Sequence, residues 1–202
     1  MESKKSHWEK VFETKTPNEV SWTQKVPQTS IDLVVNAANS KDAKIIDIGG
    51  GDSNLVDFLI DLGYTNLTVL DISGKALERC RKRLGEKAEK VTWIESDITE
   101  FKPTEVYDVW HDRAAFHFLT DKPAIDQYVA LVNNYADELI IGTFSENGPI
   151  KCSGLEISQY NSDKMAKTFS QKFSISSSLL EDHTTPFETK QNFLFCSLTR
   201  LK

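Results

Sequence analysis

Apolar residues in this chain form short continuous runs that alternate with longer stretches of helical spacing. These runs are found at 44–48, 67–71, 91–95 and about 106–111. They show little of the alternation of apolar and polar residues that is expected of a strand with one solvent-exposed face. Helical spacing follows each of the first two runs and the fourth, and it predicts helices at 53–62, 74–85 and 122–135. Strands and helices that alternate in this way predict an α/β fold with a mostly parallel sheet.

Both ends of the chain add elements to this alternating region. The pattern predicts N-terminal helices at 6–15 and 27–38 around a loop, a fifth strand at 138–145, a helix near 162–170, and β-rich stretches at 173–182 and 192–200. Without a long helix between them, the last two stretches are expected to pair antiparallel across the loop 182–190.

The predicted fold is a three-layer, Rossmann-like, doubly wound sheet of about seven strands, mostly parallel with an antiparallel C-terminal strand. We expect one domain over residues 1–202, with N-terminal helices and a lid in 1–39 and the Rossmann-like core in 40–202.

A cluster of glycines lies between the first strand and the first helix of the core. Asp47 precedes the cluster, which consists of Gly49, Gly50 and Gly51. Glycine permits a tight turn and a close approach of the backbone to a ligand, because it has no Cβ. Asp52 or Ser53 is expected to cap the helix that follows. A glycine-rich turn between strand and helix indicates a nucleotide-like ligand.

Two further acids follow the next two strands. Asp71 ends the second apolar run, and its carboxylate is suited to accept both hydroxyl hydrogens of a ribose. Asp97 closes the third run, where it is suited to accept from an adenine amine while Ile98 packs on the ring. Parallel strands bind ligands at their carboxyl ends, so the three acids are expected to line one crevice.

The combination Asp47-x-Gly49-x-Gly51, Asp71 and Asp97-Ile98 resembles the class I S-adenosylmethionine-dependent methyltransferases, over roughly residues 30–200. The resemblance implies S-adenosylmethionine as cofactor and S-adenosylhomocysteine as product. It also implies that the first acid and the glycines hold the methionine end, that Asp71 and Ile72 lie at the ribose, and that Asp97 and Ile98 lie at the adenine. One departure is Ser53, which stands where many members have a third glycine.

The end of the fourth strand, WHDRAAFHFL, concentrates polar side chains where a methyl acceptor is expected. We predict His111 and Asp112 as catalytic residues, with His111 also touching the cofactor. Asp112 and Arg113 resemble the acid–base pair that some relatives carry here, and an internal ion pair between them is the alternative. Trp8 and Trp22 are expected to form a lid over the cofactor, and plain packing of the N-terminal segment is the alternative.

Other candidates near the predicted active-site mouth have simpler explanations. His117 fits a catalytic role and a backbone hydrogen-bonding role equally well. Cys152 is expected to be structural, because nothing nearby lowers the pKa of its thiol. His183 precedes a Thr-Thr-Pro sequence that is typical of a turn.

The amino-acid composition restricts the classes of partner that the protein is expected to bind. The net charge of −6 and the pI near 5.3 disfavour a nucleic-acid substrate. Three widely spaced cysteines indicate neither a disulfide framework nor a metal site. The N-terminus lacks an apolar signal core and no apolar run has transmembrane length, so we expect a cytoplasmic protein without a membrane partner. A monomer or weak dimer is expected.

The predicted function is transfer of a methyl group to a small-molecule nucleophile by in-line displacement. Three alternatives stay open: methylation of a protein lysine, a nicotinamide-dependent oxidoreductase, and a non-catalytic nucleotide-binding protein. Asn54 occupies the last glycine position of the G-x-G-x-x-G pattern and so disfavours the nicotinamide enzyme. A small acceptor is favoured over a lysine because no appended recognition domain is evident.

Overall fold

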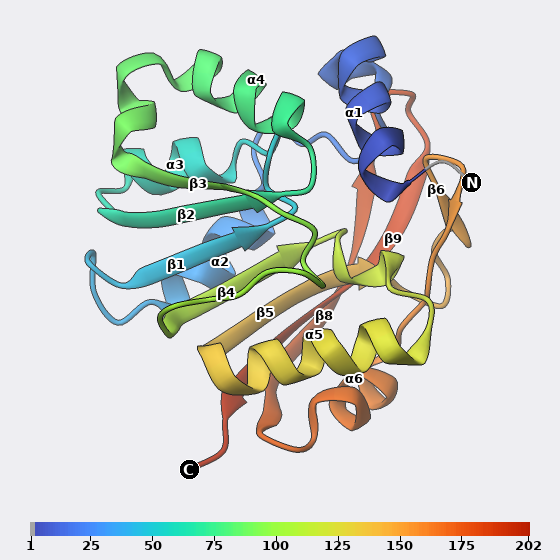
Figure 1. Cartoon of the computed structure of the whole chain (residues 1–202). Coiled ribbons are helices and arrows are strands. Elements are labelled where there is room, and N and C mark those ends of the chain that lie inside the picture. The colour runs from blue at the N-terminus through green and yellow to red at the C-terminus, as the bar shows by residue number, and fades with distance from the viewer. Residues whose placement is uncertain (1–2) are drawn as a thin grey trace.

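The computed structural model describes residues 3–202, and its centre is one twisted sheet (Figure 1). Seven strands form this sheet in the order β3-β2-β1-β4-β5-β9-β8. Their bounds are β1 (Lys44–Ile48), β2 (Asn66–Asp71), β3 (Val91–Glu95), β4 (Tyr107–Arg113), β5 (Ala136–Phe144), β8 (Phe173–Thr184) and β9 (Lys190–Arg200). Neighbouring strands β1 to β5 pair parallel, whereas β9 runs antiparallel to both of its neighbours. The predicted fold class is therefore confirmed.

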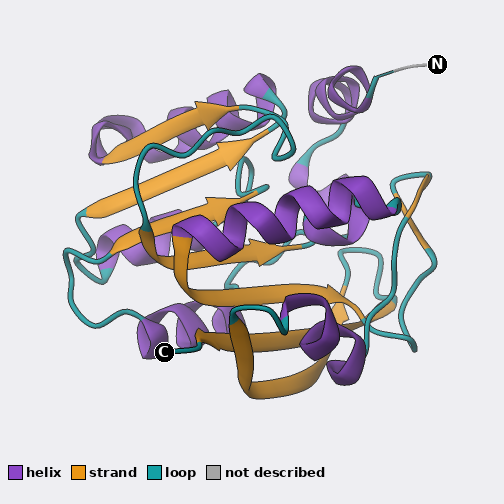
Figure 2. Cartoon of the chain, turned by 60° about the horizontal axis from the view of Figure 1, so that its bottom comes forward, coloured by secondary structure: helices purple, strands orange, loops and turns teal. Residues whose placement is uncertain are grey.

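Helices cover both faces of the sheet, which makes three layers (Figures 1 and 2). One face packs against α2 (Gln28–Ala37), α3 (Leu55–Asp61) and α4 (Gly74–Leu84). The other face packs against α5 (Lys122–Tyr135) and α6 (Ser162–Phe169). Each face buries its own apolar cluster, which explains why the central strands read as continuous apolar runs.

The remaining elements lie outside these layers. They are α1 (Lys4–Thr14), the short 3₁₀ turns η1 (Pro17–Glu19), η2 (Gly85–Lys90) and η3 (Phe116–Phe118), and a small hairpin of β6 (Lys151–Cys152) and β7 (Leu155–Glu156). Helix α1 is tied to α4. The Glu9 carboxylate accepts from the amides of Gly74 and Lys75, and the Arg79 guanidinium donates to the carbonyl oxygens of Phe12 and Lys15.

Most predicted elements lie where the sequence pattern put them. The predicted β-rich stretches at the C-terminus form the antiparallel pair β8–β9, and their loop shortens to 185–189 because both strands are longer than predicted. Strand β4 continues to Arg113, beyond the predicted end near His111. Successive side chains of a strand point to opposite faces of the sheet. Because β4 includes Asp112 and Arg113, their side chains lie on opposite faces.

Helix α3 begins at Leu55 with Asn54 at its N-cap position, so the prediction of Asp52 or Ser53 as the cap is wrong, although Ser53 still binds the first turn. The Ser53 hydroxyl accepts from the Leu55 amide at 3.1 Å. Asp52 does not cap the helix, because its carboxylate pairs with Arg79 and Arg83 of α4. The attraction of two guanidinium groups outweighs one hydrogen bond to a backbone amide.

No helix within residues 3–202 has the length and apolar character needed to cross a membrane.

Candidate active site

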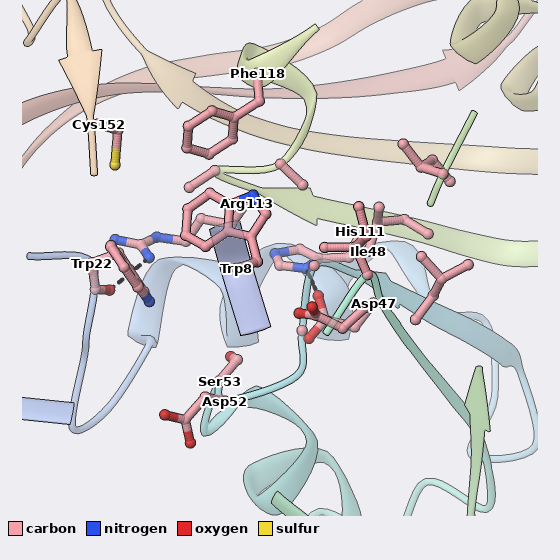
Figure 3. Close-up of a pocket in the computed structure, with 18 of the residues that line it drawn as sticks. Trp8, Trp22, Asp47, Ile48, Asp52, Ser53, His111, Arg113, Phe118 and Cys152 are labelled. Carbon is pink, nitrogen blue, oxygen red and sulfur yellow. Dashed lines mark hydrogen bonds and ion pairs between the residues drawn. The ribbon is translucent and has the colours of Figure 1, made fainter. Parts of the chain in front are cut away.

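One cleft opens at the carboxyl ends of β1 to β4, below α1 (Figure 3). Most predicted site residues line it, namely Trp22, Asp47, Gly49, Gly50, Asp71, Ile72, Asp97, Ile98 and His111. Gly51 and Asp112 are not part of its lining. The cleft also receives Arg113, which the sequence named as the partner of Asp112, and residues that the sequence did not single out as site residues, among them Lys4, Phe12 and Phe118.

The glycine turn wraps closely around two carboxylates. A Cβ built on Gly50 would lie 2.2 Å from Asp47 Oδ2, and one on Gly51 would lie 2.7 Å from Asp71 Oδ2. Both distances are shorter than any side chain tolerates, so glycine is required at these positions. Gly51 lies beneath the cleft rather than in its wall, and its amide donates to Asp71.

Asp47 is held by a histidine from the neighbouring strand. His111 is its register partner on β4 and joins Nδ1 to Asp47 Oδ1 at 2.7 Å. The other ring nitrogen, Nε2, is 2.9 Å from the Ser30 hydroxyl of α2. Because both ring nitrogens are occupied, His111 orients Asp47 and has no free nitrogen to accept a proton from an acceptor. Oδ2 of Asp47 is buried and has no hydrogen-bond partner among residues 3–202.

Asp71 and Asp97 are held mainly by backbone amides. The two oxygens of Asp71 accept from the amides of Gly51 at 3.0 Å and Ser73 at 2.8 Å. Burial raises the pKa of Asp71 to about 6, and the charges of Asp47 and Asp52 add to this shift. Oδ1 of Asp97 accepts from the amide and the hydroxyl of Thr99, at 2.9 and 2.8 Å. We call Asp47, Asp71 and Asp97 the acid wall of the cleft.

Asp112 lies on the opposite face of the sheet from His111. Its carboxylate is fully buried and accepts from the amides of Ala115 (3.1 Å) and Phe116 (3.0 Å) and from the Tyr128 hydroxyl of α5 (2.7 Å). Burial raises its pKa to about 6. This position contradicts the predicted catalytic role, because strand alternation directs the side chain into the α5 layer. It also contradicts the alternative of an ion pair with Arg113, which points to the other face.

Another part of the cleft lining is aromatic and includes Arg113. The rings of Trp8 and Trp22 are 5.7 Å apart between centroids, and those of Trp8 and Phe118 are 5.1 Å apart. Arg113 donates from Nη1 to the Trp22 carbonyl oxygen at 3.0 Å, and its guanidinium lies 4.6 Å from the Phe193 ring centroid. We call Trp8, Trp22, Arg113 and Phe118 the aromatic wall (Figure 3).

The other candidates from the sequence, His117, His183 and Cys152, have structural surroundings. His117 is buried, accepts from the Phe144 amide at 3.3 Å, and has its pKa lowered to about 3 by burial, with the Arg113 charge adding to the shift. His183 joins its Nε2 to the Ser21 carbonyl oxygen at 2.7 Å. Cys152 lines the cleft, but burial raises the pKa of its thiol to about 11. A thiol with that pKa is not a nucleophile at neutral pH.

A family model described as a methyltransferase domain matches residues 45–135, the stretch that holds the glycine turn, all three acids of the acid wall and β4. This match supports the resemblance to the class I S-adenosylmethionine-dependent methyltransferases. The matched stretch supplies the whole acid wall, whereas Trp8 and Trp22 of the aromatic wall come from outside it.

Curated relatives and solved structures agree with this resemblance. A malonyl-(acyl-carrier protein) O-methyltransferase of Anoxybacillus flavithermus is 31% identical over 103 residues, which cover 50% of this chain and 39% of that protein. A mouse eEF1A lysine and N-terminal methyltransferase is 25% identical over 123 residues, 59% of this chain and 17% of that protein. The chain thus spans well under half the length of these relatives.

Among solved structures, the 1,6-didemethyltoxoflavin-N1-methyltransferase of Burkholderia thailandensis has a similar fold. The TM-score is 0.68 at 15% identity, and the match covers 95% of this chain and 81% of that one. That enzyme was crystallised with 1,6-didemethyltoxoflavin and S-adenosylhomocysteine. At this identity the match supports the shared fold.

Proposed function

We propose that the chain transfers a methyl group from S-adenosylmethionine to a small-molecule acceptor by in-line displacement. The observation that carries this proposal is the acid wall, in which three consecutive parallel strands each direct a carboxylate into one cleft. S-Adenosylmethionine carries an ammonium group, a sulfonium, two ribose hydroxyls and an adenine amine. These groups suit a row of carboxylates.

The residues present fit this cofactor. Oδ2 of Asp47, which has no partner within residues 3–202, accepts from the ammonium group of the methionine end. Asp71 receives the ribose hydroxyls, since a carboxylate oxygen can accept a second hydrogen bond beside its amide. Asp97 and Ile98 receive the adenine amine and ring. His111 is a positioning residue that keeps the Asp47 carboxylate aimed at the cleft.

When bound, the cofactor supplies an electrophilic methyl group on a good leaving group, so the protein contributes mainly alignment and exclusion of water. Helix α1 and the loop after it bring Trp8 and Trp22 over the cleft, where their half-buried rings exclude water. His111 is not available as a general base, because both of its ring nitrogens are hydrogen-bonded. Acceptors that need no strong base, such as a carboxylate, a thiolate or a neutral amine, suit this arrangement.

The names of the two relatives indicate two different classes of methyl acceptor. One relative methylates a malonyl group on a carrier protein, and another methylates lysine and an N-terminus of a protein. The Arg113 cation in the aromatic wall supports the small-molecule class, because it repels a lysine ammonium that approaches the cleft.

The test is an incubation of the protein with S-adenosylmethionine labelled in its methyl group and with cell extract split into metabolite and protein fractions. We expect label in the metabolite fraction, and none with an Asp47→Ala variant that is folded by circular dichroism. Label in the protein fraction alone would favour the lysine alternative. A thermal shift with NAD but none with S-adenosylhomocysteine would replace the methyltransferase with a nicotinamide enzyme.

A further inference from the structure

Arg113 carries hydrogen-bond donors that the rest of the described protein does not use. Nη1 donates to the Trp22 carbonyl oxygen, but Nε and Nη2 are buried and have no partner within residues 3–202. Buried donors of a charged group are costly to leave unsatisfied, so the great majority have partners in a folded protein or its complexes. Two such donors on one side chain that lines the cleft point to a missing ligand.

The charge of Arg113 also lacks a direct counterion. No carboxylate of residues 3–202 lies within ion-pair distance of its guanidinium. Glu181 and Asp47 act on it only from a distance, and both carboxylates have partners of their own, Thr29 and Gln24 for Glu181 and His111 for Asp47. Burial lowers the pKa of Arg113 to about 10, so the side chain stays charged at neutral pH. A half-buried cation without a direct counterion that lines a cleft favours an anion as its partner.

The two free nitrogens have a defined geometry. In a guanidinium group, Nε–H and the Nη2–H beside it point in the same direction and are spaced to match the two oxygens of a carboxylate. This side-on edge is the one left free, because Nη1 is the nitrogen bound to the Trp22 carbonyl. The free edge therefore has the geometry for two-point binding of a carboxylate.

The surroundings of Arg113 separate it from the acid wall. Arg113 lies two residues beyond His111 on the same face of β4, and its guanidinium points toward Trp22 and away from the Asp47–His111 pair (Figure 3). Half-buried rings of Trp8, Trp22 and Phe118 line the same side of the cleft. Arg113 thus lies in an apolar part of the cleft that the three acids leave for a second molecule.

We propose that Arg113 binds a carboxylate of the methyl acceptor side-on, and that the acceptor is a small organic acid whose apolar body packs against Trp8, Trp22 and Phe118. This inference rests on the proposed function. The methionine end of the cofactor also carries a carboxylate that Arg113 could bind. The experiment therefore has two arms, one for the cofactor carboxylate and one for the acceptor carboxylate.

The first arm concerns the cofactor. Calorimetry measures S-adenosylhomocysteine and 5′-methylthioadenosine, which lacks the amino-acid end, with the wild type and with Arg113→Gln. We expect both ligands to bind the variant within threefold of the wild type. If S-adenosylhomocysteine weakens more than tenfold while 5′-methylthioadenosine is unchanged, Arg113 holds the cofactor carboxylate and the proposal is wrong.

The second arm concerns the acceptor and uses phenylacetate as probe, with phenylacetamide as its uncharged isostere. Protein saturated with S-adenosylhomocysteine is titrated with each. We expect phenylacetate to bind at least tenfold more tightly than the amide, and Arg113→Gln to abolish this preference. Arg113→Lys, which keeps the charge but loses the side-on edge, should retain part of it. Equal binding of acid and amide by the wild type, or an unchanged preference in Arg113→Gln, would overturn the proposal.

One control variant tests whether the effect is specific to Arg113, and one outcome separates the anion subsite from the proposed function. Lys4→Gln removes another cation that lines the cleft, one that is exposed, and it should leave the preference for phenylacetate unchanged. A protein that binds S-adenosylhomocysteine and prefers phenylacetate, yet forms no methylated product from any extract, would refute the proposed function while keeping the anion subsite.

Discussion

The acid wall and the aromatic wall line one cleft but are built differently. The acid wall comes from the ends of three consecutive strands, and Asp71 and Asp97 accept from backbone amides of the turns after β1, β2 and β3. The aromatic wall joins side chains from α1, the loop after it, the end of β4 and η3, and its contacts are long-range, such as that of Arg113 with Trp22. A wall held by local turns suits a ligand common to a family. A wall assembled from distant segments suits a ligand particular to this chain.

Charge separates the two walls as well. The acid wall concentrates carboxylates, and their mutual repulsion contributes to the raised pKa of Asp71. The aromatic wall has Arg113 as its charged group, surrounded by rings. A cationic cofactor relieves the repulsion on one side, and an anionic acceptor neutralises the cation on the other. The following predictions test this division, from the largest expected effect to the smallest.

Asp112→Ala should destabilise the folded protein around the end of β4. Removing the carboxylate leaves the amides of Ala115 and Phe116 and the Tyr128 hydroxyl without their acceptor in a buried site. We expect the free energy of unfolding to fall by about 3–5 kcal/mol, measured by urea denaturation. Asp126→Ala, on the exposed side of α5, is the control and should change it by less than about 0.5 kcal/mol. A folded, stable Asp112→Ala protein that loses only turnover would restore the catalytic role.

Stability should depend on pH through the same residue. The pKa of Asp112 is raised from an ordinary 3.8 to about 6, so the folded state holds more protons than the unfolded state between these values. The contribution of Asp112 to stability is therefore present at low pH and is lost as the pH rises from about 4 to about 6. Asp112→Asn, which does not titrate, should gain about 2–3 kcal/mol relative to the wild type over this interval.

Urea unfolding of the two proteins at several pH values measures that difference. His117, whose pKa is lowered to about 3, gives an opposite slope, but it is present in both proteins and cancels. Parallel stability profiles for the wild type and Asp112→Asn would show that Asp112 keeps an ordinary pKa in the folded protein.

Asp71→Ala should weaken binding of S-adenosylhomocysteine by about 1.5–3 kcal/mol, roughly 10–100-fold, because hydrogen bonds to a charged group are lost. The structure predicts a loss of stability too, since Asp71 holds the amides of Gly51 and Ser73. Calorimetry gives the affinity and thermal denaturation gives the stability. Unchanged affinity in a folded variant would remove Asp71 from the cofactor site.

Asp97→Ala should lower affinity for S-adenosylhomocysteine by about 1 kcal/mol, because one hydrogen bond at the adenine is lost. The wild type should prefer S-adenosylhomocysteine over its inosine analogue, in which oxygen replaces the adenine amine, and the variant should lose this preference. Glu100→Ala, exposed just beyond the same turn, serves as the control. A preference that survives in Asp97→Ala would place the adenine elsewhere.

Of these substitutions, Phe118→Leu should have the smallest effect on the affinity for the cofactor product. Its ring belongs to the aromatic wall, so S-adenosylhomocysteine affinity should stay within about threefold, a change of under 1 kcal/mol. Turnover with the acceptor found in the labelled extract should fall more than this affinity does. A large loss of S-adenosylhomocysteine affinity would show that the cofactor, and not the acceptor, contacts this side of the cleft.

The sequence by itself determined the sheet and the acid wall. Strand and helix periods are local properties, so β1, β3 and α5 have the predicted bounds. Parallel strands place their carboxyl ends at one edge of the sheet, and for this reason the sequence alone predicts that Asp47, Asp71 and Asp97 share a cleft. The glycine turn followed from the same local chemistry, because only glycine tolerates the close approach of Asp47 and Asp71.

Only the tertiary structure decided the roles of the residues at the end of β4. His111, Asp112 and Arg113 are adjacent in sequence, and the sheet sends the middle one into the α5 layer and the outer two toward the cleft. The signal for this split is strand alternation, which requires knowing that β4 reaches Arg113. That Arg113 keeps two donors free depends on where Trp22 and Phe193 come to lie. Contacts between such distant segments are fixed by the packing of the whole chain, which no local pattern encodes.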